Sequence, residues 1–353
     1  MTNSQRATPA YPGRSTHSEP SVSTMLAVVA DGYGTADVLR MTHLPIPRPG
    51  PDEVLVSVHA AGLDRGTWHL MTGRPYLLRA FFGLRRPRQR VCGRDVAGTV
   101  TAVGAAVRGV NIGDEVYGIG RGTFAQYAVA KSTRVARKPA NQSFAEAAVV
   151  PISGLTALQA LRDIGRVQAG QQVLITGASG GVGAYAVQLA AMFGAHVTGV
   201  CSPAKADFVR SVGAERVLDY TTSHFTSDAR RYDLIIDIAG NATLTQLRDA
   251  LTSSGTAVLV GEDHDQITGG MMRQLRGWAL SLSRRRRFVG LLSKERGSDL
   301  QVLTDLIESG HMTPHIDRSF CLGDAADAMR HLESGEAFGK IAILPSVQAG
   351  RGE

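Results

Sequence analysis

The sequence is poor in cysteine, and its thiols stand far apart. Cys92, Cys201 and Cys321 are the only cysteines among 353 residues. This spacing offers neither a disulfide framework nor a cluster of cysteine metal ligands. We therefore expect a reducing, cytoplasmic compartment.

Long apolar runs are missing as well. No apolar run reaches the roughly 18 residues that a transmembrane helix needs, so we expect no membrane span. Residues 1–24 are polar and rich in serine, threonine and proline, without the apolar segment of a signal peptide. They predict a disordered tail, and Arg6 and Arg14 among the serines also fit a transit peptide.

Acidic residues are too few to balance the basic ones. The chain has 31 Asp and Glu against 38 Lys and Arg, a net charge of +7. Much of the excess lies in RRPRQR at 85–90 and RRRR at 284–287. Such runs usually form a solvated surface, and the alternative is attraction of a polyanion or an anionic substrate. Because no nucleic-acid module accompanies them, we expect no nucleic-acid partner.

Two patterns of elements divide the chain. Short strand patterns dominate from Met25 to about Pro151, and strands alternate with helices after Thr156. The alternation requires a parallel sheet with helices on both faces, and a ligand cleft is expected between the two domains. The expected strands lie at 25–30, 53–62, 96–104, 114–120 and 125–130, then at 172–177, 196–202, 216–220, 233–240 and 256–261.

The stretch VLITGASGGVGAYAVQLA, residues 173–190, combines a buried strand, a glycine turn and a packed helix. Free backbone N–H groups and the positive end of the helix meet at such a turn, where a pyrophosphate can bind. The loop TGASGGVG also fits short-chain dehydrogenases, in which a Tyr-x-x-x-Lys follows a loop near the N-terminus. Here the only such pair, Tyr127 and Lys131, precedes the loop, which excludes that family.

Several further motifs appear in a fixed order. They are GRDVAGTVTAVGAAVRGVNIGDEVYGIG (93–120), PISGLTALQAL (151–161), GVCSPAKADFVRSVGAERVLDY (199–220) and GKIAIL (339–344). Together with the glycine loop they resemble the medium-chain dehydrogenase/reductase superfamily over nearly the whole chain. The resemblance implies an α/β protein with a GroES-like, β-barrel-type catalytic domain at 25–153 and 289–353. A Rossmann domain, a doubly wound parallel sheet at 154–288, would bind the cofactor.

The zinc ligands of that superfamily's alcohol dehydrogenases have no counterpart here. Arg94-Asp95 stands where their His-Glu pair falls, LDRGTW at 63–68 replaces their first Cys, and the four-cysteine lobe is missing. A zinc site needs about four N, S or O ligands, and the isolated His43, His59 and His69 do not supply them. The chain therefore resembles the zinc-independent branch, which includes quinone oxidoreductases and enoyl reductases.

That resemblance implies hydride transfer to a quinone or an α,β-unsaturated carbonyl. Without a Lewis acid, simple alcohol oxidation is difficult, whereas conjugation spreads the developing charge of an enone or a quinone. The substrate is then a small carbonyl compound or quinone, and the cofactor supplies the hydride.

The end of the second parallel strand favours NADPH. An NAD-binding fold places Asp or Glu there, whereas HVTGVCS is followed by no acid. Ser202 and Lys205 suit a 2′-phosphate, and the resemblance assigns them to it. The alternative is that Ser202 only caps a helix and Lys205 is a solvated residue.

The resemblance assigns further residues to the cofactor, and some have packing alternatives. Phe288 equally fits a core position, and Gly339 also fits a turn. Ser179, Gly180, Gly181 and Val182 would meet the pyrophosphate, Tyr220 the adenosine, Thr156, Val260 and Gly261 the nicotinamide end, while Phe288, Gly339 and Lys340 would close over the cofactor.

The catalytic residues are the least defined part of the sequence. Related reductases carry Asn-Pro-x-Asp at the cleft, where this chain has DRGT at 64–67. Asp64 is one candidate, and Tyr76 in the lid-like segment 68–90 is another, although Tyr76 also fits a buried aromatic. Arg94 is a further possible carbonyl partner.

Two other functions stay open at this point. The altered cleft motif and the arginine run at 284–287 also fit a non-catalytic NADPH-binding sensor, and a metal-free alcohol or aldehyde dehydrogenase is the second alternative. The resemblance further implies a homodimer formed through the cofactor domains.

Overall fold

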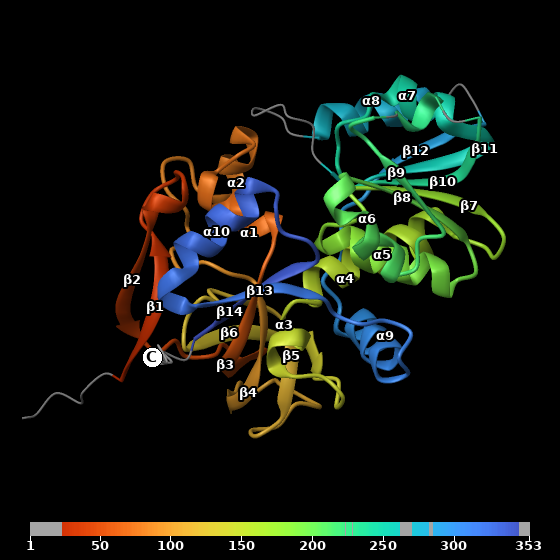
Figure 1. Cartoon of the computed structure of the whole chain (residues 1–353). Helices are drawn as coiled ribbons and strands as arrows, with labels where there is room; N and C mark the ends of the chain where they lie inside the picture. The colour runs from red at the N-terminus through yellow and green to blue at the C-terminus, as the bar shows by residue number, and fades with distance from the viewer. Residues whose placement is uncertain (1–22, 223, 228, 262–269, 282–284, 346–353) are drawn as a thin grey trace, which may run out of the picture.

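The computed structural model describes residues 23–222, 224–227, 229–261, 270–281 and 285–345. Two six-stranded sheets, one mainly antiparallel and one parallel, form two domains that lie side by side (Figure 1). The predicted tail falls mostly outside the described residues, and its last residue, Thr24, already belongs to β1 (Thr24–Ala30). Within the described part of the chain, no helix is long and apolar enough to cross a membrane.

The first domain is a barrel-type sheet with strand order β13-β14-β3-β4-β5-β6. An additional pairing of β3 with β6 bends this sheet back on itself, and β1 pairs separately with β2. The strands are β2 (Leu39–Pro45), β3 (Glu53–Leu63), β4 (Asp95–Val103), β5 (Glu115–Arg121), β6 (Tyr127–Arg137), β13 (Ile316–Cys321) and β14 (Lys340–Leu344). Its helices are α1 (Arg65–Thr72), α2 (Arg79–Phe82), α3 (Phe144–Ala148) and α10 (Ala325–Ser334).

The second domain is an all-parallel sheet with strand order β12-β11-β10-β7-β8-β9. The strands are β7 (Gln172–Thr176), β8 (His196–Cys201), β9 (Arg216–Asp219), β10 (Tyr232–Asp237), β11 (Leu251–Leu259) and β12 (Arg287–Gly290). The helices are α4 (Pro151–Gln159), α5 (Gly181–Met192), α6 (Ala206–Ser211), α7 (Leu244–Ala250) and α8 (Met271–Ser281), and α9 (Gly297–Glu308) packs on both α4 and β6. The expected doubly wound sheet is confirmed.

Alternation along β7 shows why the parallel sheet needs helices on both faces. Val173 and Ile175 pack in a core with residues of α4 and α5, whereas Leu174 packs on the opposite face with Leu247 of α7. All three strand residues are fully buried. A strand buried on both faces must be apolar throughout, as this run is.

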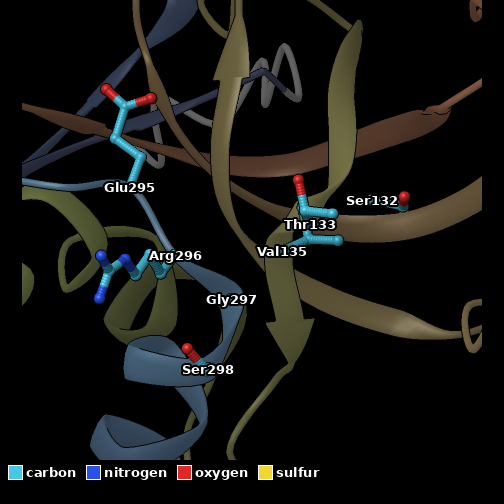
Figure 2. A pocket seen from close by; sticks show the side chains of 7 residues that line it. All are labelled: Ser132, Thr133, Val135, Glu295, Arg296, Gly297 and Ser298. Atoms are coloured by element: carbon cyan, nitrogen blue, oxygen red, sulfur yellow. The ribbon is translucent and has the colours of Figure 1, made fainter.

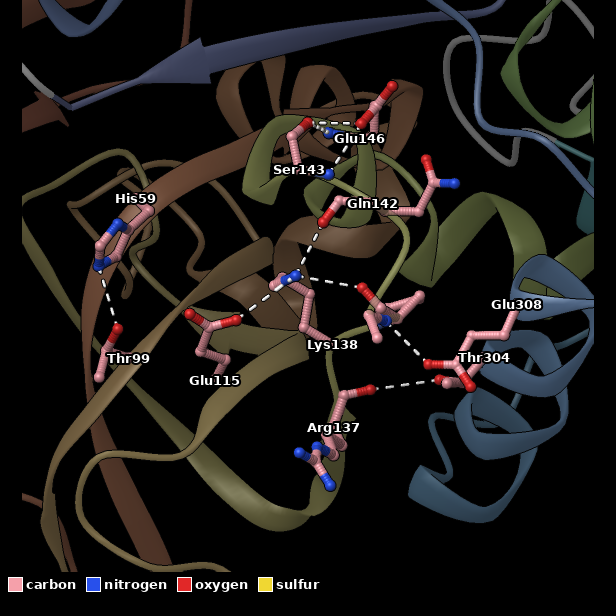
Figure 3. Close-up of polar contacts among 12 residues, drawn as sticks. His59, Thr99, Glu115, Arg137, Lys138, Gln142, Ser143, Glu146, Thr304 and Glu308 are labelled. Atoms are coloured by element: carbon pink, nitrogen blue, oxygen red, sulfur yellow. Dashed lines mark hydrogen bonds and ion pairs between the residues drawn. The ribbon is translucent and has the colours of Figure 1, made fainter.

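The segment between β6 and α3 connects the barrel-type domain to α9 (Figure 3). Thr304 of α9 donates to the backbone oxygen of Arg137, and the Glu308 carboxylate accepts from the amide of Ala140 at 2.8 Å. Lys138, only 8% exposed, donates to the backbone oxygen of Gln142 at 2.7 Å and lies 3.4 Å from a Glu115 oxygen. These contacts fix the barrel-type domain against a helix that packs on α4.

Five of the helices and strands named above were not expected from the sequence: α1 and α2, which lie within residues 63–90, and β2, β13 and α8. β2 and β13 have no fully buried residue, so their apolar residues show no one-sided alternation. α8 follows residues 262–269, which lie outside the described residues, and it carries several exposed apolar side chains.

Candidate functional site

The glycine loop joins the carboxyl end of β7 to α5, as expected. Gly177 has a φ of 66°, a left-handed conformation that favours glycine. A Cβ on Gly183 would lie 2.1 Å from the Gly177 oxygen, so no other residue fits this tight turn. Gly180 caps the helix, and the amides of the first helical turn lack partners four residues earlier. The loop thus presents N–H groups and a positive helix end to an anion.

The barrel-type domain covers this loop from the other side. The Gly339 amide donates to the Ser179 oxygen at 2.8 Å. Lys340 is only 3% exposed, and a Cβ on Gly181 would lie 2.5 Å from its Cδ atom. The predicted residues Gly339 and Lys340, more than 150 positions from the loop, are therefore brought against Ser179 and Gly181.

Lys340 belongs to a buried polar cluster that the sequence did not predict. Its Nζ atom donates to the Ser153 hydroxyl at 2.9 Å and lies 3.9 Å from an oxygen of Asp95. Asp95 is fully buried, and its other oxygen accepts from the Ile152 amide at 3.0 Å. Burial raises the pKa of the Asp95 carboxyl well above its usual value, and the Asp64 carboxylate raises it further, while Lys340 lowers it.

Asp64, a predicted catalytic residue, caps helix α1. One carboxylate oxygen accepts from the Thr67 amide at 2.7 Å. Its other oxygen, Oδ2, is buried and has no hydrogen-bond partner among the described residues. The same is true of the Thr67 hydroxyl and of Asp95 Oδ2. Buried polar atoms without partners are costly in a folded protein, and a bound polar ligand group would satisfy them.

The predicted 2′-phosphate residues lie beyond the end of β8. Ser202 precedes the short turn at Pro203–Lys205, is half-buried, and its hydroxyl makes no capping hydrogen bond. Lys205 Nζ donates to the backbone oxygens of Gly335 and Ala337 at 2.6 and 2.7 Å. Burial lowers the pKa of this lysine. In the described structure Lys205 thus ties the parallel-sheet domain to the segment before Gly339.

The remaining residues predicted to bind the cofactor differ in exposure and in hydrogen bonding. Tyr220 follows β9 and is 63% exposed. Val260 and Gly261 both donate their amides to the Asp237 backbone oxygen, at 3.0 and 2.9 Å. The Thr156 hydroxyl donates to the backbone oxygen of Ile152 at 2.7 Å. Together with the glycine loop, Val260 and Gly261 line the carboxyl edge of the parallel sheet, where ligands bind in this type of fold.

A buried ion pair between Asp237 and Arg273 stabilises the carboxyl edge of the parallel sheet. Asp237, fully buried, accepts from the Thr176 hydroxyl at 2.7 Å and from Arg273 of α8 at 2.5 Å. Thr176 in turn accepts from the amides of Ile238 and Ala239. The sequence analysis missed Arg273 because nothing in its local pattern distinguishes it from a surface arginine.

Three candidate residues lie away from the glycine loop. Phe288 is 3% exposed and belongs to the core of the parallel-sheet domain, the packing alternative considered for it. Tyr76 is 41% exposed rather than buried, and the guanidinium of Arg79 lies 4.7 Å from its ring centre. Arg94 forms an ion pair with Glu295, which Arg134 also contacts at 2.7 Å. The structure therefore does not bring these three side chains together.

A hollow lies beside Glu295, between β6 and the start of α9 (Figure 2). Its lining residues are Ser132, Thr133, Val135, Glu295, Arg296, Gly297 and Ser298. None of the residues predicted to bind the cofactor belongs to this lining.

The residues present do not fit a catalytic zinc ion. Arg94 and Asp95 stand where the resemblance places the His-Glu pair of zinc enzymes, and the Arg94 guanidinium forms an ion pair with Glu295. In the described ranges, no three or more His, Cys, Asp or Glu side chains come close enough together to hold a metal ion.

A barrel-type domain that covers the glycine loop of a parallel-sheet domain is the architecture of two-domain dehydrogenases, and comparison with known proteins agrees. A family model described as an alcohol dehydrogenase GroES-like domain matches residues 50–140, and one described as a zinc-binding dehydrogenase matches residues 212–343. The chain belongs to the medium-chain dehydrogenase/reductase family and is quinone-oxidoreductase-like.

Similar proteins extend over nearly the whole chain. A chloroplastic quinone oxidoreductase of Triphysaria versicolor is 34% identical, over 91% of this chain and 98% of its own. A 2-methylene-furan-3-one reductase of Solanum lycopersicum is 32% identical, over 92% of this chain and 80% of its own. The structure of a mycobacterial protein complexed with NADPH is 25% identical, with a TM-score of 0.79, and covers 91% of this chain and 100% of that one.

Proposed function

We propose that this protein is an NADPH-dependent, zinc-independent reductase of quinones or α,β-unsaturated carbonyl compounds. One observation carries the proposal: Gly339 and Lys340 of one domain close over the glycine loop of the other. A dinucleotide bound at the loop would lie between the domains, where water would be excluded and a small acceptor could meet it. The quinone oxidoreductase and furanone reductase relatives support this class of acceptor.

The bound NADPH supplies a hydride. The chain's own residues bind and orient the two reactants. The amides at the start of α5 would hold the pyrophosphate, and the Lys340 ammonium, which contacts Ser153 and Asp95, would add a positive charge beside it. For an enone, the hydride would add to the β-carbon, leaving NADP+, and a proton from a hydroxyl or from water would add to the α-carbon. Asp64 Oδ2 and the Thr67 hydroxyl, which are buried and have no hydrogen-bond partner in the described part of the chain, are the groups that we assign to polar contacts near the reacting atoms.

The preference for NADPH rests on Ser202 and Lys205. No acidic side chain directly follows β8 to bind a ribose 2′-hydroxyl. Lys205 now contacts two carbonyl oxygens, which are weaker partners for an ammonium than a phosphate dianion. We infer that Lys205 exchanges these carbonyls for the 2′-phosphate when the cofactor binds.

Zinc independence rests on the donor set. Arg94 and Asp95 cannot replace a His-Glu pair, and a cation next to Arg94 and Lys340 would be repelled. Without a metal to polarise an isolated carbonyl, conjugated acceptors are the substrates that the site can activate most readily.

The test measures consumption of NADPH and of NADH, by nicotinamide absorbance, against a panel of quinones, enones, aldehydes and ketones, with and without a chelator. We expect NADPH to be consumed when quinones or enones are present. The chelator should not change the rate of this consumption. Use of aldehydes or simple ketones alone would favour the metal-free alcohol dehydrogenase. Binding of NADPH with no turnover across the panel would favour a sensor.

A further inference from the structure

The stretch from Arg65 to Arg94 has an extreme charge bias. It contains no Asp or Glu, although acidic residues are spread through the rest of the chain. Its eight arginines are Arg65, Arg74, Arg79, Arg85, Arg86, Arg88, Arg90 and Arg94. The central part, residues 74–90, is called the 74–90 projection below.

Large apolar side chains of the 74–90 projection are exposed. Phe81 is 70% exposed and Leu84 is 75% exposed, while Leu77 and Phe82 are 47% and 43% exposed. Figure 1 shows α2, which includes Phe81 and Phe82, at the outer end of the barrel-type domain, beyond the sheet. A group of aromatic and aliphatic side chains is therefore exposed to water in the folded chain, and the exposure of each is energetically unfavourable.

The backbone beneath these side chains is held in place. Arg79 donates to the backbone oxygens of Gly73 and Thr72 at 2.9 and 3.2 Å, and its guanidinium lies 4.4 Å from the ring centre of Tyr33. The Tyr33 hydroxyl donates to the Gly83 oxygen at 2.6 Å. Gly83 has a φ of 122°, and a Cβ there would lie 2.1 Å from the Arg86 oxygen. The turn is thus built to keep Phe81 and Leu84 outward.

The arginines beside these apolar residues are largely uncompensated. Arg90 pairs with Asp31, which Arg40 also contacts. Arg85, Arg86 and Arg88 are exposed and form no ion pair with any acidic side chain in the described part of the chain. Positive charge and apolar surface therefore occupy the same projection.

We propose that the 74–90 projection docks the protein on a membrane surface that contains anionic lipids. Guanidinium groups match lipid phosphates, and exposed Phe and Leu side chains can enter the layer between headgroups and acyl chains. The docking is peripheral. It goes beyond the proposed reductase function and does not depend on it.

The mixed chemistry favours a membrane over a nucleic acid. A nucleic acid would neutralise the arginines, but the aliphatic Leu77 and Leu84 side chains neither stack on bases nor donate hydrogen bonds. A lipid interface satisfies both kinds of group at once.

The experiment is co-sedimentation of the full-length protein with vesicles. One vesicle type mixes phosphatidylglycerol with phosphatidylcholine, and the other is phosphatidylcholine alone. We expect binding to the anionic vesicles only, weakened by high salt because lipid phosphates and arginines are screened. Arg85→Gln with Arg86→Gln should weaken binding by about fivefold per arginine. Phe81→Ser with Leu84→Ser should weaken it by about tenfold.

Matched controls separate a docking site from general charge and hydrophobicity. Arg137→Gln with Arg318→Gln removes two exposed arginines elsewhere, and Ile112→Ser removes an apolar side chain that is 66% exposed. These controls should bind like the unmodified protein, and thermal unfolding should show that every variant is folded. The proposal is overturned if the protein does not bind anionic vesicles, or if the control variants lose as much binding as the projection variants. It is also overturned if the protein binds a single-stranded oligonucleotide and only the Arg85→Gln, Arg86→Gln variant changes that affinity.

Discussion

Lys205 is the residue on which cofactor choice depends. Its ammonium now donates to two backbone oxygens of the barrel-type domain. We predict that Lys205→Ala raises the KM for NADPH by about 10- to 100-fold, the range of a charged hydrogen bond, and leaves the KM for NADH nearly unchanged. Steady-state kinetics with both cofactors measures the difference.

Arg210→Ala is the matched control for that substitution. Arg210 lies on α6, which begins directly after Lys205, and pairs with Asp207 at 2.8 Å, and it is not assigned to the phosphate. Its loss should change neither KM by more than about twofold. If Lys205→Ala weakened NADH and NADPH equally, Lys205 would act by holding the two domains together and not by reading the phosphate.

A second prediction concerns the effect of Asp95 on how the unfolding free energy depends on pH. Its carboxyl has a raised pKa in the folded chain because it is buried and lies near Asp64. The folded chain therefore keeps this proton more tightly than the unfolded chain, and the stability that Asp95 contributes falls as pH rises above about 4, the unfolded value. Asp95→Asn cannot titrate. The unfolding free energy of the variant minus that of the unmodified protein should rise with pH, measured by denaturant titration from pH 4 to 8.

Asp219→Asn provides the opposite case. Hydrogen bonds from the amide and hydroxyl of Thr221 lower the pKa of the exposed Asp219 carboxyl. The stability that Asp219 contributes is present above the unfolded pKa of about 4 and is lost as pH falls below it, so its difference curve should fall as pH rises toward 4 and stay flat from pH 4 to 8, which requires extending the titration below pH 4. A falling curve for Asp95→Asn would mean that Lys340 stabilises the Asp95 carboxylate more than burial destabilises it.

Among the elements, the turn from β7 into α5 has no room for a side chain at Gly183. A Cβ on Gly183 would collide with the Gly177 oxygen at 2.1 Å, whereas one on Gly180 would lie 3.5 Å from that atom, an ordinary contact. We predict that Gly183→Ala lowers the unfolding free energy by about 2 kcal/mol or more, and Gly180→Ala by less than about 1 kcal/mol. Chemical denaturation checks both, and equal losses would show that the turn adapts freely.

Helices and strands could be predicted from the sequence where the local order of apolar residues and glycines reflects burial in the folded chain. The apolar run at 172–177 and the glycines after it define a strand, a turn and a helix within one stretch of chain, and the structure has them there. The same reasoning missed β2 and β13, because strands without a buried face leave no alternating pattern. It also expected Tyr76 as either a carbonyl partner or a buried aromatic, and the structure exposes it.

On the scale of the whole molecule, the site is assembled from residues that local patterns cannot connect. Lys340 and Ser153 are 187 positions apart, and Lys205 and Gly335 are 130 apart. Family resemblance placed Lys340 and Lys205 at the cofactor, but their partners depend on how the two domains meet. The buried oxygens of Asp64 and Asp95 that lack a hydrogen-bond partner among the described residues likewise appear only when the chain has folded. The predicted homodimer, domain boundaries and cytoplasmic location stay predictions.

Substitution of Gly339 tests whether the contact between the two domains contributes to NADPH binding. It has a φ of 69°, and a Cβ would lie 2.6 Å from the His315 oxygen. Gly339→Ala should displace the amide that donates to Ser179 and move Lys340 away from the glycine loop. We predict an NADPH Kd raised by about tenfold, roughly the worth of one lost charged hydrogen bond, measured by fluorescence titration. An unchanged Kd would contradict a role for this closure in binding.

The most direct measurement follows the hydride itself. NADPH labelled with deuterium at the transferred position of the nicotinamide is incubated with the protein and a cyclic enone, and the product is analysed by mass spectrometry and NMR. The account predicts a saturated ketone with deuterium on the β-carbon and a solvent proton on the α-carbon, with a chelator making no difference. Deuterium on the carbonyl carbon, giving an alcohol, would contradict it, as would a product that forms only when metal is present.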